Sequence, residues 1–87
     1  MANIEFPPDQ TEDRNGPVVS FPAVIDGKQI KCAISYDALK HRFGATYYDL
    51  LSTFTANRKH IEQLACVLIM CGRFEDNGTI LIKAEDV

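Results

Sequence analysis

Residues 21–44 read FPAVIDGKQIKCAISYDALKHRFG, and this stretch decides the fold of the chain. Apolar residues alternate with other residues on both sides of Asp26-Gly27, which predicts two strands, 18–25 and 28–34, that each turn one face toward a core. Asp26-Gly27 fits a two-residue type I′ turn, because that turn needs positive φ at both central positions. Pro22 donates no backbone hydrogen bond and therefore indicates an edge strand or a bulge.

A short helix is predicted after this hairpin. Ser35 is a typical N-cap, since its hydroxyl can accept from a backbone N–H one turn later. Leu39 and Phe43 are four residues apart, so in a helix over 36–43 they share one face. Gly44 ends the helix, because glycine adopts the left-handed conformation readily.

Two further helices are predicted: 47–56, with Thr46 as its cap, and 58–71, ended by Gly72. Apolar residues at helical spacing predict that the first of these buries one stripe, made of Tyr47, Leu50, Leu51 and Phe54. No glycine or proline separates the two helices, so one bent helix over 47–71 is an alternative that the sequence leaves open.

The outer segments complete the fold. Residues 3–6 predict a short strand, residues 7–17 with three prolines predict a loop, and residues 79–84 predict a last strand. We therefore expect a single α+β domain over residues 1–87. It has an antiparallel sheet of three to four strands with two to three helices packed on one face, in the order β-β-β-α-α-α-β.

A chain of 87 residues, 46% of them hydrophobic, can bury one core. The predicted core consists of the apolar side chains that these elements turn inward: Phe6, Val19, Phe21, Ile25, Ile30, Cys32, Ile34, Leu39, Phe43, Leu50, Leu51, Phe54, Ile61, Leu64, Leu68, Ile80 and Ile82.

Net charge and cysteine content limit the cellular compartments and the classes of partner that this protein can have. A net charge of −3 argues against nucleic acid, although residues 18–45 carry four basic residues against two acids. Three cysteines, two of them in the apolar run 66–71, do not make a disulfide framework. We see neither a signal peptide nor an apolar run long enough to span a membrane, so we expect a cytoplasmic protein with no membrane contact.

The residues that could bind a metal are His41, His60, Cys66 and Cys71. Cys66 and Cys71 would lie about 140° apart around a helix, which is poor geometry for chelating one ion. The five glycines are scattered and form no phosphate-binding loop. We expect neither a metal nor a cofactor.

Catalysis would need a nucleophile beside a base and an orienting group. Cys32 falls on the core face of a predicted strand, and Ser35 is explained as a helix cap. Acidic pairs such as Glu75-Asp76 fall in predicted loops. We assign no catalytic residue, and the sequence favours a non-enzymatic role without settling the question.

Two basic segments are candidates for a partner or ligand surface. Lys40, His41 and Arg42 occupy the last turn of a predicted helix, where cations also suit the helix dipole. Arg58 and Lys59 stand at a helix start, where cations oppose the dipole and indicate a partner or an acidic neighbour. The glutamate four residues after Arg58 can form an ion pair with it.

Apolar candidates for the same surface are Tyr48, Val67 and Met70. Tyr48 falls outside the predicted buried stripe, so we expect it to be exposed. Val67 and Met70 belong to the apolar run 66–71, which covers every side of its helix end. That pattern predicts a central helix or an oligomer interface.

The chain resembles the DUF1488 family of small bacterial proteins of unknown function. The resemblance rests on Phe21-Pro22, the Asp26-Gly27 hairpin, Cys32-Ala33-Ile34, Leu39 and Arg42-Phe43-Gly44. It implies a compact α+β domain of a proteobacterial cytoplasm, and it supplies no functional residues to transfer. The run 66–71 departs from the charged, Glu-rich last helix that relatives in the family often have.

We therefore expect a small cytoplasmic interaction module that binds a protein partner or itself. One alternative is a nucleic-acid-associated transcriptional regulator, although no helix-turn-helix with a basic recognition helix is visible. The other alternative is a small-ligand-binding protein or an enzyme, which would need a concave pocket.

Overall fold

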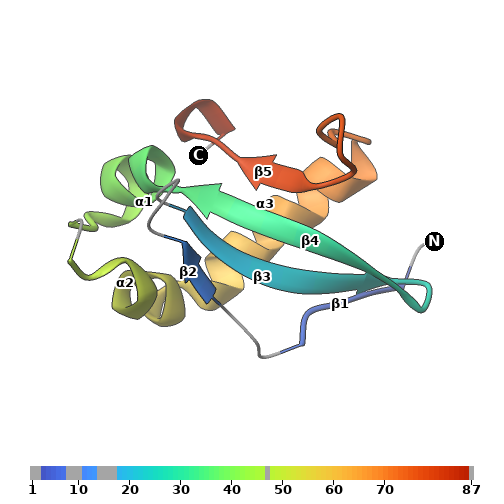
Figure 1. The fold of residues 1–87 in the computed structure, drawn as a ribbon, viewed down its shortest axis with the longest axis horizontal. Helices are drawn as coiled ribbons and strands as arrows, with labels where there is room; N and C mark the ends of the chain where they lie inside the picture. The colour runs from blue at the N-terminus through green and yellow to red at the C-terminus, as the bar shows by residue number, and fades with distance from the viewer. Residues whose placement is uncertain (1–2, 8–10, 14–17, 47, 87) are drawn as a thin grey trace.

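Figure 1 shows a computed structural model of the chain, which describes residues 3–7, 11–13, 18–46 and 48–86. In these residues the elements are β1 (Ile4–Glu5), β2 (Thr11–Asp13), β3 (Val18–Ile25), β4 (Lys28–Ser35), α1 (Tyr36–Phe43), α2 (Leu50–Ala56), α3 (Arg58–Met70), β5 (Ile80–Ile82) and the 3₁₀ turn η1 (Ala84–Asp86). The α+β class and the order of strands, helices and last strand are confirmed.

The β3–β4 hairpin forms the centre of the sheet. The two strands pair antiparallel along their whole length, with Phe21 opposite Cys32. Asp26 and Gly27 have φ angles of 50° and 88°, which confirms the predicted turn. The Asp26 carboxylate also accepts a hydrogen bond from the Asn3 N–H at 2.9 Å, which fastens the start of the described chain to this turn.

The last strand joins the sheet beside β4 and parallel to it, with Ile80 opposite Cys32 and Ile82 opposite Ile34. The sheet is therefore mostly antiparallel, as predicted, but mixed at this edge, which corrects the expected pairing of the last strand. The chain leaves the end of β4, crosses the helical layer and returns to run in the same direction, as a parallel crossover requires. β5 is also shorter than predicted, because η1 begins at Ala84.

Two short strands share the outer edge of β3. β1 pairs with residues 24–25 and β2 with residues 18–20, so within the described ranges residues 21–23 have no partner on that side. Pro22 lies in this gap, as the edge-strand prediction requires. β2 corrects the prediction of a loop throughout 7–17. Its sequence, Thr-Glu-Asp, has no hydrophobic alternation, and its pairing comes from the open edge of β3.

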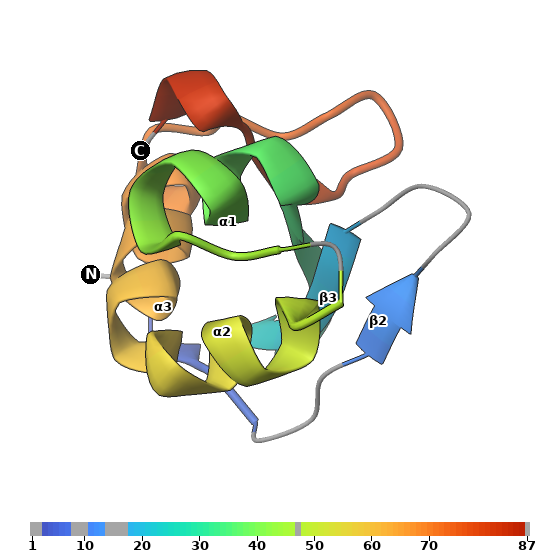
Figure 2. The same ribbon diagram turned by 90° about the vertical axis from the view of Figure 1, so that its left-hand side faces the viewer.

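All three helices cover one face of the sheet, as Figure 1 and Figure 2 show from two directions. α1 contacts β4, α2 contacts β3 and α3 contacts β5. The predicted caps of α1 are confirmed: the Ser35 hydroxyl accepts from the Ala38 N–H at 3.1 Å, and Gly44 ends the helix with φ of 73°. No helix of the described residues covers the other face of the sheet.

Asn57 separates α2 from α3, which settles the alternative between two helices and one bent helix. Its φ and ψ of −118° and 19° interrupt the helical repeat, and its side-chain amide donates to the Thr53 carbonyl at 2.9 Å. The Ile61 N–H donates to the Asn57 carbonyl at 3.1 Å, so α3 begins at once. The sequence signal is weak because asparagine does not force a break, as proline would.

α2 begins at Leu50, three residues later than predicted, and Asp49 rather than Thr46 is its N-cap residue. The Asp49 carboxylate accepts from the Thr46 N–H at 2.6 Å and from the Thr53 hydroxyl at 3.3 Å. These local bonds tie Thr46 and Thr53 to Asp49 and compete with a helical turn before Leu50. Tyr47 lies outside the described residues.

The core lies between the sheet and the helices. Its largest fully buried side chains are Val19, Phe21, Cys32, Ile34, Leu39, Leu50, Phe54, Ile61, Ile80 and Ile82, all of them predicted. Leu68 is also buried, and Phe6, Ile25, Ile30, Phe43 and Leu64 pack against the core from its rim. Phe21 and Phe54 join sheet to helix, with ring centroids 5.1 Å apart.

Leu51 is the one predicted core residue that the structure leaves exposed, at 36% of its surface. Leu50 and Phe54 are one turn apart and face the sheet, and Leu51 stands about 100° around the helix from Leu50, at the rim. Its predicted place in the buried stripe was therefore wrong, because the helix begins only at Leu50 and its buried residues are Leu50 and Phe54.

Leu50 and Leu51 form a matched pair for testing this difference. We expect Leu50→Ala to lower the free energy of unfolding by about 2–5 kcal/mol, because it opens a cavity in a close-packed core. We expect Leu51→Ala to lower it by less than about 1 kcal/mol. Urea denaturation followed by circular dichroism measures both changes, and equal losses would contradict the assignment.

Candidate functional site

The structure brings the two basic segments together. Residues 40–42, Lys-His-Arg, are exposed in the last turn of α1, and Lys59 is exposed in the first turn of α3. Phe43 and His60 join these two turns by an edge-to-face ring contact, with centroids 5.4 Å apart. One end of the helical layer is therefore built from cations of both helices. We call it the cationic end: Lys40, His41, Arg42, Lys59 and His60.

Arg58 belongs to the interior contacts of the domain rather than to this surface. Its Nε donates to the Glu62 carboxylate at 2.8 Å, which confirms the predicted ion pair. Its guanidinium also donates to the Pro7 carbonyl at 2.6 Å and lies 5.4 Å from the centre of the Phe54 ring. Arg58 therefore links the N-terminal segment, α3 and the core.

An exposed stripe continues from the cationic end along α3. The helix buries Ile61, Ala65, Leu68 and Ile69, and the residues on its opposite side are exposed. At 100° per residue, these exposed side chains fall within about 100° of the helix circumference. We call them the outward stripe: Lys59, His60, Gln63, Val67 and Met70.

The outward stripe changes from cationic to apolar along its length. Lys59 stands at its N-terminal end, whereas Val67 and Met70, exposed at 58% and 70%, stand near its C-terminal end. The prediction of a central helix, apolar and covered on all sides, is therefore wrong for this end of α3. The helix has 13 residues, and no helix in the described part of the chain is long and apolar enough to cross a membrane.

Two aromatic side chains are exposed outside this stripe. Tyr48 is 87% exposed in the turn before α2, which confirms the exposure expected for it. Phe74 is 43% exposed after α3, and its backbone bridges to Ile80 at the edge of β5. The sequence pattern did not signal Phe74, because a lone aromatic in a turn has no periodicity to read.

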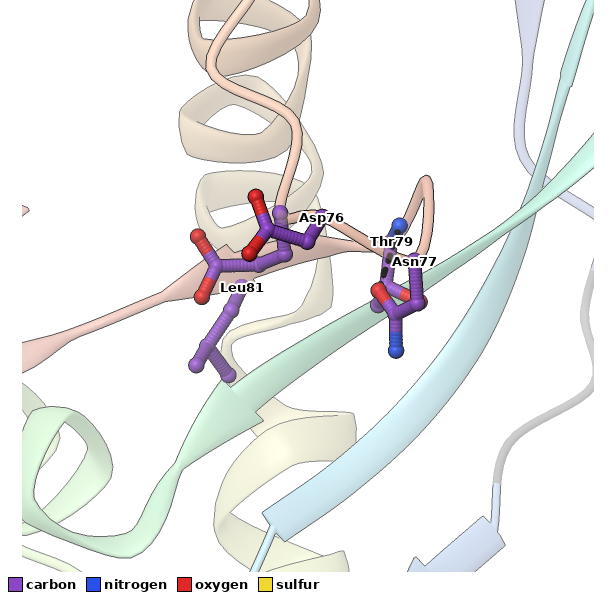
Figure 3. A pocket seen from close by; sticks show the side chains of 5 residues that line it. Asp76, Asn77, Thr79 and Leu81 are labelled. Carbon is purple, nitrogen blue, oxygen red and sulfur yellow. Dashed lines mark hydrogen bonds between the residues drawn. The ribbon is translucent and has the colours of Figure 1, made fainter.

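The surface of the described residues carries two open hollows, both bordered by Leu81. The first, of about 380 Å³, is lined by Glu75, Asp76, Asn77, Thr79 and Leu81 (Figure 3). The second, of about 420 Å³, is lined by Ser35, Asp37, Leu81, Lys83, Ala84 and Glu85. The second could not be read from the sequence, because its walls come from segments more than 40 residues apart.

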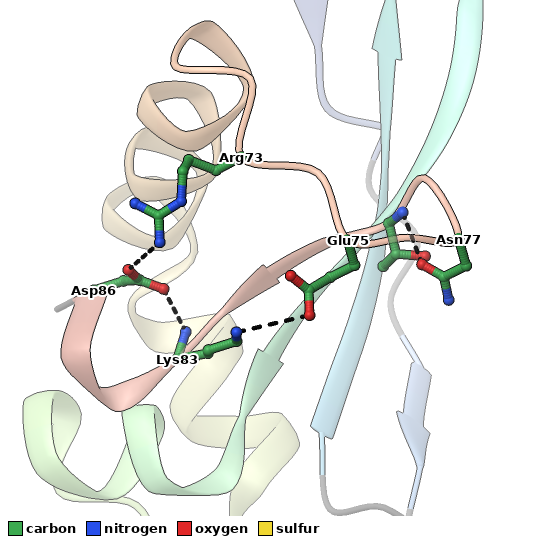
Figure 4. Close-up of polar contacts among 6 residues, drawn as sticks. Arg73, Glu75, Asn77, Lys83 and Asp86 are labelled. Carbon is green, nitrogen blue, oxygen red and sulfur yellow. Dashed lines mark hydrogen bonds and ion pairs between the residues drawn. The ribbon is translucent and has the colours of Figure 1, made fainter.

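Polar side chains near these hollows bind one another (Figure 4). The Lys83 ammonium lies 3.7 Å from Glu75, and Arg73 lies 3.7 Å from Asp86. The second Asp86 oxygen accepts from the Lys83 backbone N–H at 3.0 Å. These contacts fasten η1 and the segment before β5, and as partly exposed pairs each contributes less than about 1 kcal/mol.

The three thiols lie in different environments. Burial raises the pKa of the Cys32 thiol from 9.0 to about 12, so this side chain stays a neutral part of the core. The Cys66 sulfur lies 4.0 Å from the Met70 sulfur, and Cys71 is exposed. The described ranges contain no group of three histidine, cysteine, aspartate or glutamate side chains placed to hold a metal ion.

These features define a small α+β domain with helices on one sheet face and an exposed cationic-to-apolar helix stripe. The chain belongs to DUF1488, a family of proteins of unknown function whose family model matches residues 4–82, and the resemblance seen in the sequence is thereby confirmed.

Relatives and a solved structure agree with this assignment. The chain is 37% identical over 78 residues to the uncharacterized protein YrdB of Escherichia coli K12 and to that of Shigella flexneri. The matches cover 88% of this chain and 92% of the relatives. A crystal structure of a DUF1488 protein of unknown function from Shewanella loihica PV-4 has a TM-score of 0.82 at 29% identity, over 91% of this chain and 90% of that one.

The outward stripe was only partly visible in the sequence. Lys59, Val67 and Met70 were singled out, but Gln63, which connects them, was not. Their spacing of three to four residues would have placed them on one helix face. This pattern was missed because the apolar run 66–71 predicts burial on every side of the helix end.

Arg58 and Lys59 are adjacent cations with different expected effects on stability. Arg58→Ala should lower the free energy of unfolding by about 1–2 kcal/mol, because it removes charged hydrogen bonds to Glu62 and Pro7 at a half-buried position. Lys59→Ala should change it by less than about 0.5 kcal/mol. Denaturant titration of both variants checks this, and a larger loss for Lys59→Ala would refute the structural role of Arg58.

Cys32 should resist modification that the other two thiols accept. At about pH 8, iodoacetamide is expected to label Cys66 and Cys71 in the folded protein and Cys32 only after denaturation, as read by peptide mass spectrometry. The neutral Cys32 thiol also links stability to pH. Because the pKa of this thiol is higher in the folded than in the unfolded state, its contribution to the free energy of unfolding is complete below pH 9.0. This contribution is lost as the pH rises toward about 12. Rapid labelling of Cys32 by iodoacetamide in the folded protein would contradict the protection expected for this thiol.

Proposed function

We propose that this protein is a small non-enzymatic interaction module of the bacterial cytoplasm that binds another protein through the outward stripe of α3. The observation that carries the proposal is the exposure of Val67 and Met70 on the side of α3 opposite the core. Most of the apolar surface of these two side chains faces water. Covering it with a partner would stabilise a complex by about 25 cal/mol for each Å² buried.

The distribution of charge favours a protein over a nucleic acid. Phosphate backbones bind surfaces on which cations recur along the contact, and here the cations gather at one end of the stripe. Val67 and Met70 offer a phosphate nothing to bind, whereas a protein partner can bury both side chains.

Self-association fits the stripe less well than a different partner does. In a twofold dimer the same patch meets itself, so two α3 helices packed through this stripe would run either antiparallel or parallel. In the antiparallel pair, Lys59 of one copy would approach the apolar end of the other, and desolvating an ammonium without a counter-charge is unfavourable. In the parallel pair, the two cationic ends would lie together and repel each other.

The side chains that line the two hollows bordered by Leu81 support a non-enzymatic role. The Ser35 hydroxyl is engaged as the α1 cap, and the Lys83 ammonium lies beside Glu75. These polar groups stabilise the fold and leave no nucleophile paired with a base at either hollow among the residues described.

Site-specific photo-crosslinking in bacteria tests the proposal. A photoreactive amino acid at position 63, in the middle of the outward stripe, is expected to give a discrete adduct with another protein. The adduct should disappear when Val67→Glu and Met70→Glu are added. The matched control is the same photoreactive residue at exposed position 29 on the helix-free face, which should give no such adduct.

Each other outcome is informative. An adduct of twice the mass of the chain would replace the partner by self-association, and a nuclease-sensitive product would favour nucleic acid. An adduct that survives both glutamate substitutions in a variant that remains folded by circular dichroism would refute the proposed surface.

A further inference from the structure

We propose that the outward stripe and the cationic end together recognise an acidic amphipathic helix of the partner, with carboxylates at one end and apolar side chains at the other. This inference rests on the proposed function and specifies the chemistry of the partner at the same site.

The charge of this surface favours an acidic partner. Within the described ranges, Lys40, Arg42 and Lys59 form no ion pair, whereas the neighbouring Arg58 is paired with Glu62. The first turn of α3 also contains no acidic residue. Cations there oppose the helix dipole, and an external carboxylate would stabilise both the side chains and the helix N-terminus.

The order of charged and apolar residues along the outward stripe sets the spacing that a partner has to match. Lys59 and Met70 are eleven residues apart, which is about 16 Å along a helix axis, or three turns. Gln63 lies between the two ends and Val67 next to the apolar one. A complementary segment therefore carries its acidic residues about three helical turns from its apolar anchors.

The outward stripe also favours a helical conformation of the partner. The outward stripe is the side-chain surface of a helix, whose backbone groups bond within the helix and offer no edge for an added strand. Helices pack on such surfaces by placing the side-chain ridges of one into the grooves of the other. An amphipathic helix is the element that suits this contact.

The surface also fits another protein better than a second copy or a membrane. In a second copy, Glu75 and Asp76 line a hollow bordered by Leu81 and are not part of the outward stripe. These two residues therefore do not present acidic and apolar side chains on one element. Helices that bind anionic membranes carry cations along the length of the polar face that borders their apolar face. On α3 the cations are confined to one end.

A peptide selection tests the inference without assuming a sequence. A displayed library of helix-forming peptides of about 18 residues, randomised on one face, is selected against the full chain. We expect binders enriched in aspartate or glutamate at one end and in leucine, methionine or phenylalanine about three turns away. Binding of the leading peptide, read by fluorescence anisotropy, should weaken as salt is raised.

Variants of the chain then locate the contact. Lys59→Glu and Val67→Glu should each weaken binding by about tenfold or more, because each places a carboxylate against the matching feature of the peptide. Lys31→Glu is the matched control: it makes the same charge reversal at an exposed position of β4 outside the helical layer and should leave affinity unchanged. A peptide with lysine in place of its acidic residues should recover binding to Lys59→Glu.

Failure of this inference is distinguishable from failure of the proposed function. Selection of no binders, of binders without acidic enrichment, or of peptides that bind Lys59→Glu as well as the unmodified chain overturns the acidic helix. So does binding to vesicles of anionic lipid without binding to peptides. In each of these cases, an adduct at position 63 that depends on Val67 and Met70 would still support a protein partner of different chemistry.

Discussion

The turn at Asp26 and Gly27, with positive φ at both residues, sets the register of β3 against β4, and the rest of the fold depends on that register. Strand side chains alternate between faces, so a slip of one residue would move Phe21 and Cys32 to the helix-free side. Cys32 is also the residue opposite which Ile80 of β5 aligns. The hairpin thus decides which strand face receives the helices and where the last strand can add.

The helical layer follows from this one apolar face. Phe21 of β3 packs against Phe54 of α2. Arg58, at the start of α3, lies over the Phe54 ring and also binds Glu62 and the Pro7 carbonyl. With one layer of helices, α3 has one side on the core and one side toward solvent. The outward stripe is the consequence, because no second layer among the described residues covers the side of α3 that faces away from the core.

The proposed binding of another protein depends on the relative positions of the apolar and charged side chains of the outward stripe. A hydrophobic residue alone on a surface is ordinary, but Val67 and Met70 share one helix face and continue a line that begins at Lys59. The ring contact between Phe43 and His60 brings the end of α1 to the same place. A surface with a cationic end and an apolar end selects partners by orientation as well as by composition.

Local signals in the sequence determined the hairpin, the Ser35 and Gly44 caps of α1, nearly all of the core and the cations that form the surface. These features depend on φ preferences, hydrogen bonds within one turn and the period of apolar residues, all of which act over a few neighbouring residues. Tertiary structure alone decided the direction of β5, the edge strand β2 and the exposure of Leu51. It also decided which side of the apolar end of α3 meets solvent. Each of these depends on contacts between segments distant in sequence, where several local patterns are equally satisfied and packing selects among them.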